Sequence, residues 1–166
     1  LTVLNGNRLY SSNMRNKVFV IRFVSDVLSP LFFLPALALI PLSTAASILQ
    51  ALPILVTMGA ALVLGQKIKL RRWSAIIFGF TGVLLIVRPG MADFEPASIL
   101  ALLGVTFLAS RDLATRVMPS GLSTFTVTTY AFGASIIAGI MLIPFFDSLI
   151  WPTSEQWFWI LLLTVL

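Results

Sequence analysis

The sequence predicts an all-α fold, a polytopic transmembrane helical bundle. Of its 166 residues, 58% are hydrophobic and 10% are charged, and the mean hydropathy is +1.02. Soluble domains carry about 25% charged residues, so this composition excludes an ordinary soluble core. The stretch from Val27 to Gln66 runs for 40 residues without an ionisable side chain. Because about 20 helical residues cross a bilayer, this stretch must fold back on itself as a helical hairpin.

Proline and glycine residues divide the apolar sequence into five complete spans and a partial sixth. Pro41 separates the first two spans, and further breaks follow at Pro89-Gly90, Pro119-Ser120-Gly121 and Pro152. The expected spans are 17–40, 43–65, 72–88, 96–117 and 122–146, with the partial sixth from Gln156 to the end. The chain starts at Leu1 rather than Met and its last apolar run is too short for a bilayer, so we expect a fragment of a longer protein.

Lysine and arginine gather in alternate connections between the spans. They precede the first span, fill the connection between the second and third, and end the fourth: Arg8, Arg15, Lys17; Lys67, Lys69, Arg71, Arg72; Arg111, Arg116. The turn from Pro41 to Thr44 has no charge. Because cytoplasmic loops collect Lys and Arg, we expect the N-terminal segment to be cytoplasmic and this turn to be extracytoplasmic. The net charge of +5 thus reflects topology, and no nucleic-acid partner is expected.

The sequence contains neither cysteine nor histidine. This excludes disulfides, His-ligated metals and His-based catalytic triads for these residues, so no catalytic residue, metal or cofactor is expected. An intramembrane aspartyl protease needs two aspartates at depth, and only Asp26 and Asp112 lie within the expected spans. An intramembrane enzyme and a non-catalytic assembly subunit of the membrane are the alternatives to a transporter.

Ordered proline, glycine and arginine residues mark the second and third spans. They are Pro41-Leu42-Ser43-Thr44-Ala45-Ala46, Leu52-Pro53-Ile54, Leu64-Gly65-Gln66, Arg71-Arg72-Trp73, and the run from Gly79 through Gly82 to Arg88-Pro89-Gly90. In this order they resemble the EamA-like family of the drug/metabolite transporter superfamily. Many members of that family carry a glutamate directly after the glycine that ends the second span, where this sequence has Gln66.

The resemblance implies part of a ten-helix inverted-repeat carrier. Residues 1–16 would be the end of a preceding span and a cytoplasmic loop, 17–90 the last three helices of the first repeat, and 91–166 the truncated start of the second. The implied function is secondary transport of a small metabolite, such as an amino acid, nucleoside or drug-like compound, by alternating access in the bacterial cytoplasmic (inner) membrane. The implied partners are the lipid bilayer and a small-molecule substrate; a coupling proton and a homodimer are left open.

Two charged pairs lie within the spans. Arg22 and Asp26 are four residues apart and share a helix face. An aspartate there costs about 2.5–3.5 kcal/mol, so Asp26 either binds a substrate ammonium or a proton, or is simply neutralised by Arg22. Arg111 and Asp112 point about 100° apart on their helix. We expect them to pair with other helices, Arg111 with Asp26 or Asp112 with Arg22, either as a structural clasp or as part of the substrate pathway.

Further pathway candidates are polar residues near helix breaks. Pro53 lies between Gln50 and Thr57, which are seven residues apart on one face. Its missing N–H predicts an interruption, which is either a substrate site or a structural kink. Thr128 and Tyr130 belong to a hydroxyl-rich segment that either lines a polar cavity or satisfies carbonyls of its own helix.

Three glycines are predicted to serve helix packing. Gly79 and Gly82 lie in the third span and Gly65 ends the second. Small residues let helices approach closely, so a packing role is expected at all three.

Overall fold

The computed structural model describes residues 17–88, 95–118, 124–146 and 153–165. In these ranges the chain is helical apart from short connections, which confirms the predicted all-α class. Five helical segments are long and apolar enough to cross a membrane: Lys17–Leu39, Leu42–Leu62, Leu70–Val87, Ala97–Arg116 and Thr124–Phe145. Every predicted span boundary lies within three residues of these limits.

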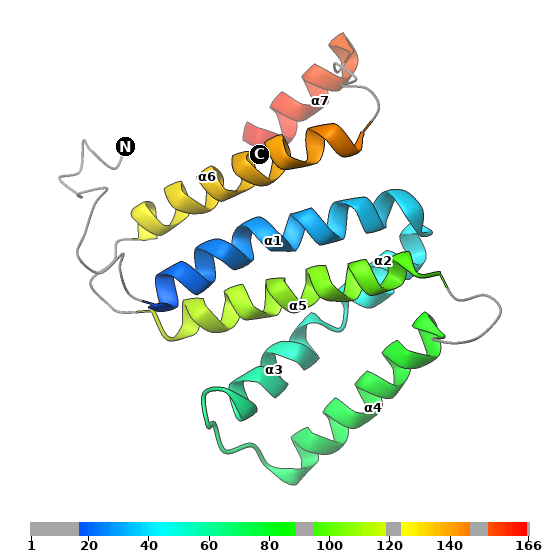
Figure 1. Ribbon diagram of the computed structural model, residues 1–166, viewed down its shortest axis with the longest axis vertical. Helices are drawn as coiled ribbons and strands as arrows, with labels where there is room; N and C mark the ends of the chain where they lie inside the picture. Colours follow the sequence, from blue (N-terminus) through cyan, green and yellow to red (C-terminus); the bar gives the residue numbers. More distant parts are fainter. Residues whose placement is uncertain (1–16, 89–94, 119–123, 147–152, 166) are drawn as a thin grey trace.

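Helix α1 (Lys17–Leu39) lies at the centre of the bundle. It packs most extensively along α5 (Ala97–Arg116), and its other side contacts α6 (Thr124–Leu142), as Figure 1 shows. Three helices that are distant in sequence therefore lie side by side, and they build the site described below.

The second span is broken into α2 (Leu42–Leu49) and α3 (Leu52–Leu62). At the break, the Ala51 N–H donates to the carbonyl three residues earlier at 3.0 Å, so the last turn of α2 tightens. Pro53 follows as the second residue of α3. A backbone N–H at this position has no acceptor within the helix, so proline removes no helical hydrogen bond there. The predicted interruption is confirmed, and it lies at Gln50 and Ala51.

Helix α4 (Leu70–Val87) packs against α2 and α3. An added Cβ at Gly79 would lie 2.2 Å from Ile54 Cδ1, so this glycine does permit a close contact between α3 and α4. Gly82 has no neighbour within 4 Å in the described part of the chain. Gly65 is equally open but has φ +64°, a conformation that glycine adopts without strain, so it serves the turn after α3. The packing role predicted for Gly65 and Gly82 is therefore not found in this structure.

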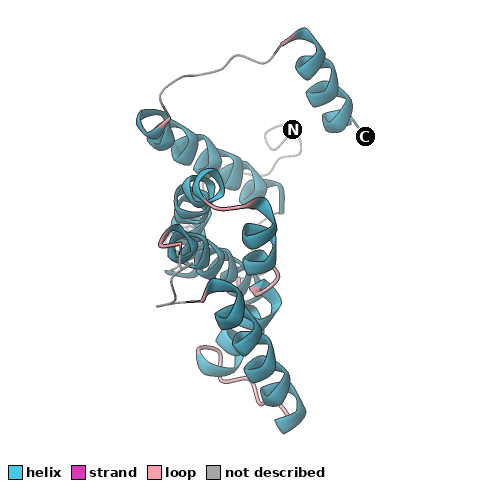
Figure 2. Cartoon of the chain, turned by 90° about the vertical axis from the view of Figure 1, so that its right-hand side faces the viewer, coloured by secondary structure: helices cyan, strands magenta, loops and turns pink. Residues whose placement is uncertain are grey.

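A buried apolar cluster joins α1, α2, α4 and α5 at the end where α1 turns into α2. Its members are mostly small or β-branched: Ala36, Ile40, Ala45, Ile48, Ala51, Val83, Val87, Ala101 and Val105. Beyond α6, the short 3₁₀ helix η2 (Ile143–Phe145) ends the fifth span, and α7 (Ser154–Val165) stands apart from the other helices (Figure 2).

The helix ends that carry the basic connections lie on the same side of the bundle, as the alternating charge pattern predicts. The start of α1, the connection from α3 to α4, the end of α5 and the start of α6 lie toward one side of the bundle (Figure 1). These are the basic connections of the sequence. Which membrane face they meet stays a prediction.

Candidate functional site

Helices α1, α5 and α6, with Leu49 of α2, line an open cavity of about 350 Å³. This volume is at the lower end of the range for small-molecule pockets, about 300–1,000 Å³. The wall combines two aromatic side chains, Phe33 and Phe132, with two charged ones, Asp26 and Arg111. Both predicted charged pairs thus contribute a residue to this cavity.

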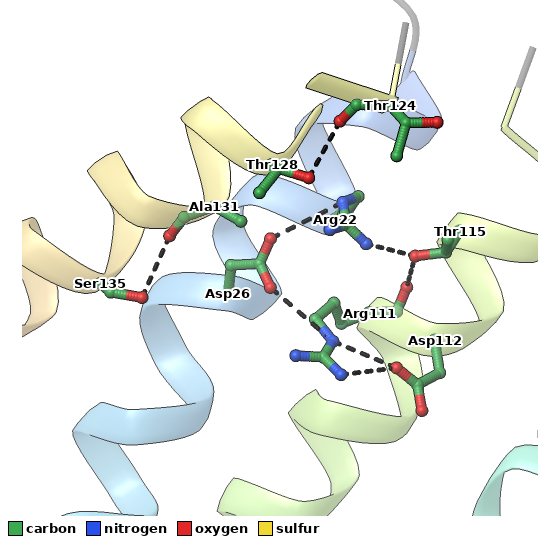
Figure 3. A network of polar contacts seen from close by, with 9 residues as sticks. All are labelled: Arg22, Asp26, Arg111, Asp112, Thr115, Thr124, Thr128, Ala131 and Ser135. Carbon is green, nitrogen blue, oxygen red and sulfur yellow. Dashed lines mark hydrogen bonds and ion pairs between the residues drawn. The ribbon is translucent and has the colours of Figure 1, made fainter. Parts of the chain in front are cut away.

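Asp26 is held between two arginines (Figure 3). It lies nine residues after Lys17, about 13 Å along the helix, and its side chain is only 8% exposed. Its Oδ2 lies 3.7 Å from Arg22 Nε and its Oδ1 lies 3.8 Å from Arg111 Nε. The predicted pairing of Arg111 with Asp26 is confirmed. Because both distances exceed hydrogen-bond length, these contacts are loose ion pairs rather than direct hydrogen bonds.

Arg111 also contacts its sequence neighbour Asp112. Its Nε and Nη2 donate to Asp112 Oδ1 at 3.1 and 2.9 Å, so these two neighbours pair with each other as well as across the helices, which the angle of about 100° between them did not predict. The arginine side chain is long enough for its guanidinium to contact Asp112 although the two Cβ atoms point in different directions. Asp112 is not the partner of Arg22 in this structure. Arg22 Nη1 instead donates to Thr115 Oγ1, and that hydroxyl donates to the Arg111 carbonyl at 2.8 Å.

These residues separate two pockets. Arg111 lines the cavity and also a second pocket of about 400 Å³ at the end of α5, which it shares with Arg22, Asp112, Thr115 and Arg116. The ion pair between Asp26 of α1 and Arg111 of α5 therefore lies between the cavity and one end of the bundle.

Three hydroxyl side chains line the cavity. Thr128 and Ser135 of α6 each donate to the carbonyl four residues earlier, at 2.9 and 3.0 Å (Figure 3). For Thr128, the two sequence alternatives are thus both realised, because it satisfies its own helix and also lines the cavity. Ser29 of α1 donates across the helices to the Gly104 carbonyl of α5 at 3.0 Å.

Gly104 brings α1 and α5 together and was not among the predicted residues. An added Cβ there would lie 2.8 Å from Phe33 Cβ, 2.9 Å from Phe33 N and 3.0 Å from Phe33 Cα. The backbones of the two helices are therefore in close contact beside the cavity. The sequence does hold a signal for this contact, since Ala97, Ala101 and Gly104 recur every three or four residues.

Tyr130 lies outside the cavity. Its ring makes edge contacts with Phe19 and Phe23 of α1, with centroids 5.4 and 6.4 Å apart. The aromatic contacts pack α6 against α1, so Tyr130 lies in the interface between these helices, and its role on the substrate pathway stays a prediction.

The candidates of the second span also lie elsewhere. Pro53 and Thr57 line a separate groove between α3 and α4, together with Arg72. Thr57 donates to the Pro53 carbonyl at 2.7 Å. Gln50 is exposed at the break between α2 and α3. None of the three is among the residues that line the cavity at Asp26.

The chemistry that the cavity offers is non-covalent. Within the described ranges, no group of three or more His, Cys, Asp or Glu side chains could hold a metal ion. A carboxylate and a guanidinium facing one space can bind a cationic and an anionic group of a ligand, and a carboxylate can carry a proton. The aromatic walls add faces on which a flat ring can stack.

Comparison with curated proteins finds three transporters. A riboflavin transporter of Vibrio cholerae serotype O1 is 32% identical over 91 residues, and one of Rhizobium johnstonii is 30% identical over 80. An S-adenosylmethionine uptake transporter of Rickettsia prowazekii is 26% identical over 80 residues. The matched segments cover 55%, 48% and 48% of this chain, but only 30%, 26% and 27% of the relatives. No solved structure matches the chain.

The family comparison agrees with the resemblance found in the sequence. The model of the EamA-like transporter family matches residues 5–88, which is about half of the 166 residues. The family and the three relatives are named as transporters rather than enzymes. Five membrane-length helices in the described ranges fit an integral membrane protein. The chain therefore belongs to the EamA-like transporter family.

Proposed function

We propose that the full-length protein is a secondary transporter that carries a small metabolite by alternating access, and that the cavity at Asp26 lies on the substrate's path. The observation that carries this proposal is a mostly buried carboxylate that faces a cavity between three membrane-length helices. Ionisable residues within membrane spans are costly and commonly mark ion or substrate pathways. Membership of the EamA-like transporter family supports the same function.

The ion pair between Asp26 of α1 and Arg111 of α5 forms one gate of this transporter. Arg111 lines both the cavity and the pocket at the end of α5, so the Arg111–Asp26 pair stands between them. At 3.8 Å the pair is loose, and Arg111 keeps Asp112 as a hydrogen-bonded partner when Asp26 binds something else. Separation of the pair by substrate therefore leaves Arg111 with a counter-charge.

The substrate is a heteroaromatic metabolite with a hydroxylated chain or sugar. Two relatives are named for riboflavin and one for S-adenosylmethionine, and both compounds join a fused nitrogen ring system to hydroxyl groups. Phe33 and Phe132 offer ring faces, and the hydroxyls of Thr128 and Ser135 can accept hydrogen bonds.

The site of action is the bacterial cytoplasmic membrane. The three relatives come from bacteria, and the basic connections give this chain a topology with cytoplasmic lysines and arginines. A coupling proton at Asp26 is part of the proposal, and uptake driven by an imposed pH gradient would test it. A homodimer stays a prediction.

The test is uptake of labelled riboflavin and S-adenosylmethionine by the full-length protein in liposomes. Hydrogen bonds to charged groups contribute about 1.5–3 kcal/mol, so Asp26→Asn should lower uptake about ten-fold or more. Asp112→Asn is the matched control, since it removes a carboxylate of the same network that does not line the cavity. We expect it to retain most of the uptake.

Three results would count against the proposal. Absence of uptake of both compounds by the unmodified protein would contradict the substrate class. Normal uptake by a folded Asp26→Asn variant would contradict the site. If Arg22 and Asp26 only neutralise each other, the double replacement Arg22→Ala with Asp26→Ala would restore uptake lost in the single variants, which would also contradict a substrate role for Asp26.

A further inference from the structure

The groove between α3 and α4 lies away from the cavity at Asp26. It has a volume of about 320 Å³ and is lined by Pro53, Ile54, Thr57, Arg72, Ala75 and Ile76. It shares no lining residue with the cavity. Ile54 packs on Gly79, one turn beyond Ala75, and so brings the two helices together at the deep end. Arg72 is the third residue of α4, so the other end of the groove lies near the basic end of the helix.

The groove lies beside a dense group of positive charges. Lys67, Lys69, Arg71 and Arg72 fall within six residues and are all exposed. Within the described part of the chain, none of them takes part in an ion pair. The sequence has no acidic residue between Asp26 and Asp93. This end of α4 thus has an uncompensated positive potential.

The start of α4 adds backbone donors to these charges. Its N-cap residue, Lys69, is extended and makes no side-chain capping bond. The first N–H groups of a helix have no intrahelical acceptor and favour an anion. The Arg72 N–H already donates to the Lys69 carbonyl at 2.8 Å, so the Leu70 and Arg71 N–H groups are the ones left for an anion beside the Arg72 guanidinium.

We propose that the groove binds an anionic phospholipid, with its phosphate at Arg72 and an acyl chain along Ile54, Ala75 and Ile76. The combination fits an amphiphile, because a fork of guanidinium donors sits at one end of a mostly apolar groove between α3, the second part of the second span, and α4. Basic residues beside membrane spans attract anionic lipids without any groove. What distinguishes Arg72 from its neighbours is that it lines the groove, whereas Arg71, Lys67 and Lys69 do not. The proposal is independent of the substrate and of the transport mechanism.

The test is native mass spectrometry of the full-length protein with phosphatidylglycerol, and with phosphatidylcholine as the neutral comparison. Loss of one cation near an anionic lipid surface weakens binding about five-fold, and loss of a bidentate phosphate contact adds to this. Arg72→Gln should therefore reduce bound phosphatidylglycerol by clearly more than about five-fold, whereas Arg71→Gln, with the same charge change outside the groove, should reduce it by about five-fold at most. Ala75→Phe fills the groove without changing charge and should also displace the lipid.

Three outcomes would overturn the proposal. Equal losses of bound phosphatidylglycerol in Arg71→Gln and Arg72→Gln would mean that lipid binding depends only on the overall positive charge. Unchanged lipid binding in Ala75→Phe would mean that the acyl chain does not enter the groove, for instance because another helix of the full-length protein covers it. If Ala75→Phe fails to fold, the comparison of the two arginine variants still decides. Phosphatidylcholine binding that falls in parallel with phosphatidylglycerol would contradict recognition of the anionic headgroup.

Discussion

Replacement of Gly104 by alanine should force α1 and α5 apart. The new Cβ would lie 2.8 Å from Phe33 Cβ and within 3.0 Å of the Phe33 backbone N and Cα. Because two of these three atoms are backbone atoms, no side-chain rotation relieves the clash. Overpacking of this kind costs about 1–3 kcal/mol. The Ser29 hydrogen bond to the Gly104 carbonyl would lengthen as well. This adds to the steric cost, so the range above is a lower bound on the loss of stability.

Gly82→Ala is the matched control for this variant. Both substitutions replace a helical glycine by alanine and gain up to about 1 kcal/mol of helix propensity. In the described part of the chain, an added Cβ at Gly82 would meet no atom within 4 Å apart from its chain neighbours and its own helix backbone. The difference in unfolding free energy between the two variants therefore isolates the steric cost at Gly104.

The assay is reversible unfolding of the full-length protein by SDS in mixed micelles. We expect Gly104→Ala to be less stable than Gly82→Ala by about 1–3 kcal/mol. Transport should fall too, because Ser29 and Asp26 share α1 while Gly104 and Arg111 share α5, so separating the helices moves the Asp26–Arg111 pair apart. Equal stabilities of the two variants would refute the close contact of α1 with α5.

Three further predictions concern single positions. Ser29→Ala removes the bond between α1 and α5 and should cost about 0.6 kcal/mol, and at most about 1.7, in the same unfolding assay, whereas Ser135→Ala, whose hydroxyl bonds within α6, should cost less. Gly65→Ala should lower the unfolding free energy by about 1–2 kcal/mol because its φ is +64°, although an added Cβ would meet no atom within 4 Å in the described part of the chain. An unchanged unfolding free energy would contradict that backbone conformation. Ser43→Cys should react with an impermeant thiol reagent from outside the cell and Lys67→Cys only after the membrane is opened; the opposite pattern would reverse the topology.

Hydropathy and charge were sufficient to predict the spans. A run of 40 uncharged residues can only be a hairpin in a bilayer, and its predicted limits lie within three residues of those observed. The interruption of the second span was predictable because proline has no N–H to donate. Its location at Gln50 and Ala51 was not predictable, since the turn tightens before the proline is reached.

The charged residues of the site were predictable in identity but only partly in pairing. A buried Asp26 needs a counter-charge, and Arg111 supplies one. The contact of Arg111 with Asp112 was missed because Cβ directions do not limit where a long, flexible side chain ends. Thr115 was missed because its hydroxyl accepts a hydrogen bond from Arg22 of another helix, and the sequence does not show that these two helices meet there.

The helix contacts were least predictable from the sequence. Gly82 and Gly104 look alike in an apolar helix, yet one is open and the other touches the Phe33 backbone. Hydropathy does not tell which helix faces which, so it cannot distinguish a glycine that packs from one that does not. The cavity could not be predicted for the same reason, because it is formed by α1, α5 and α6 together.

The most direct measurement of the central claim is substrate protection of a cysteine in the cavity. Thr128 and Thr129 are adjacent, both are exposed, and both donate to a carbonyl of their own helix, but only Thr128 lines the cavity. Each is replaced by cysteine in a background without other cysteines, and the rate of reaction with a small cationic thiol reagent is measured with and without riboflavin. At ten times the dissociation constant of the substrate, labelling of Thr128→Cys should slow about ten-fold. Thr129→Cys should react at the same rate in both conditions. Equal rates for Thr128→Cys with and without a compound that the protein transports would contradict a substrate path through the cavity at Asp26.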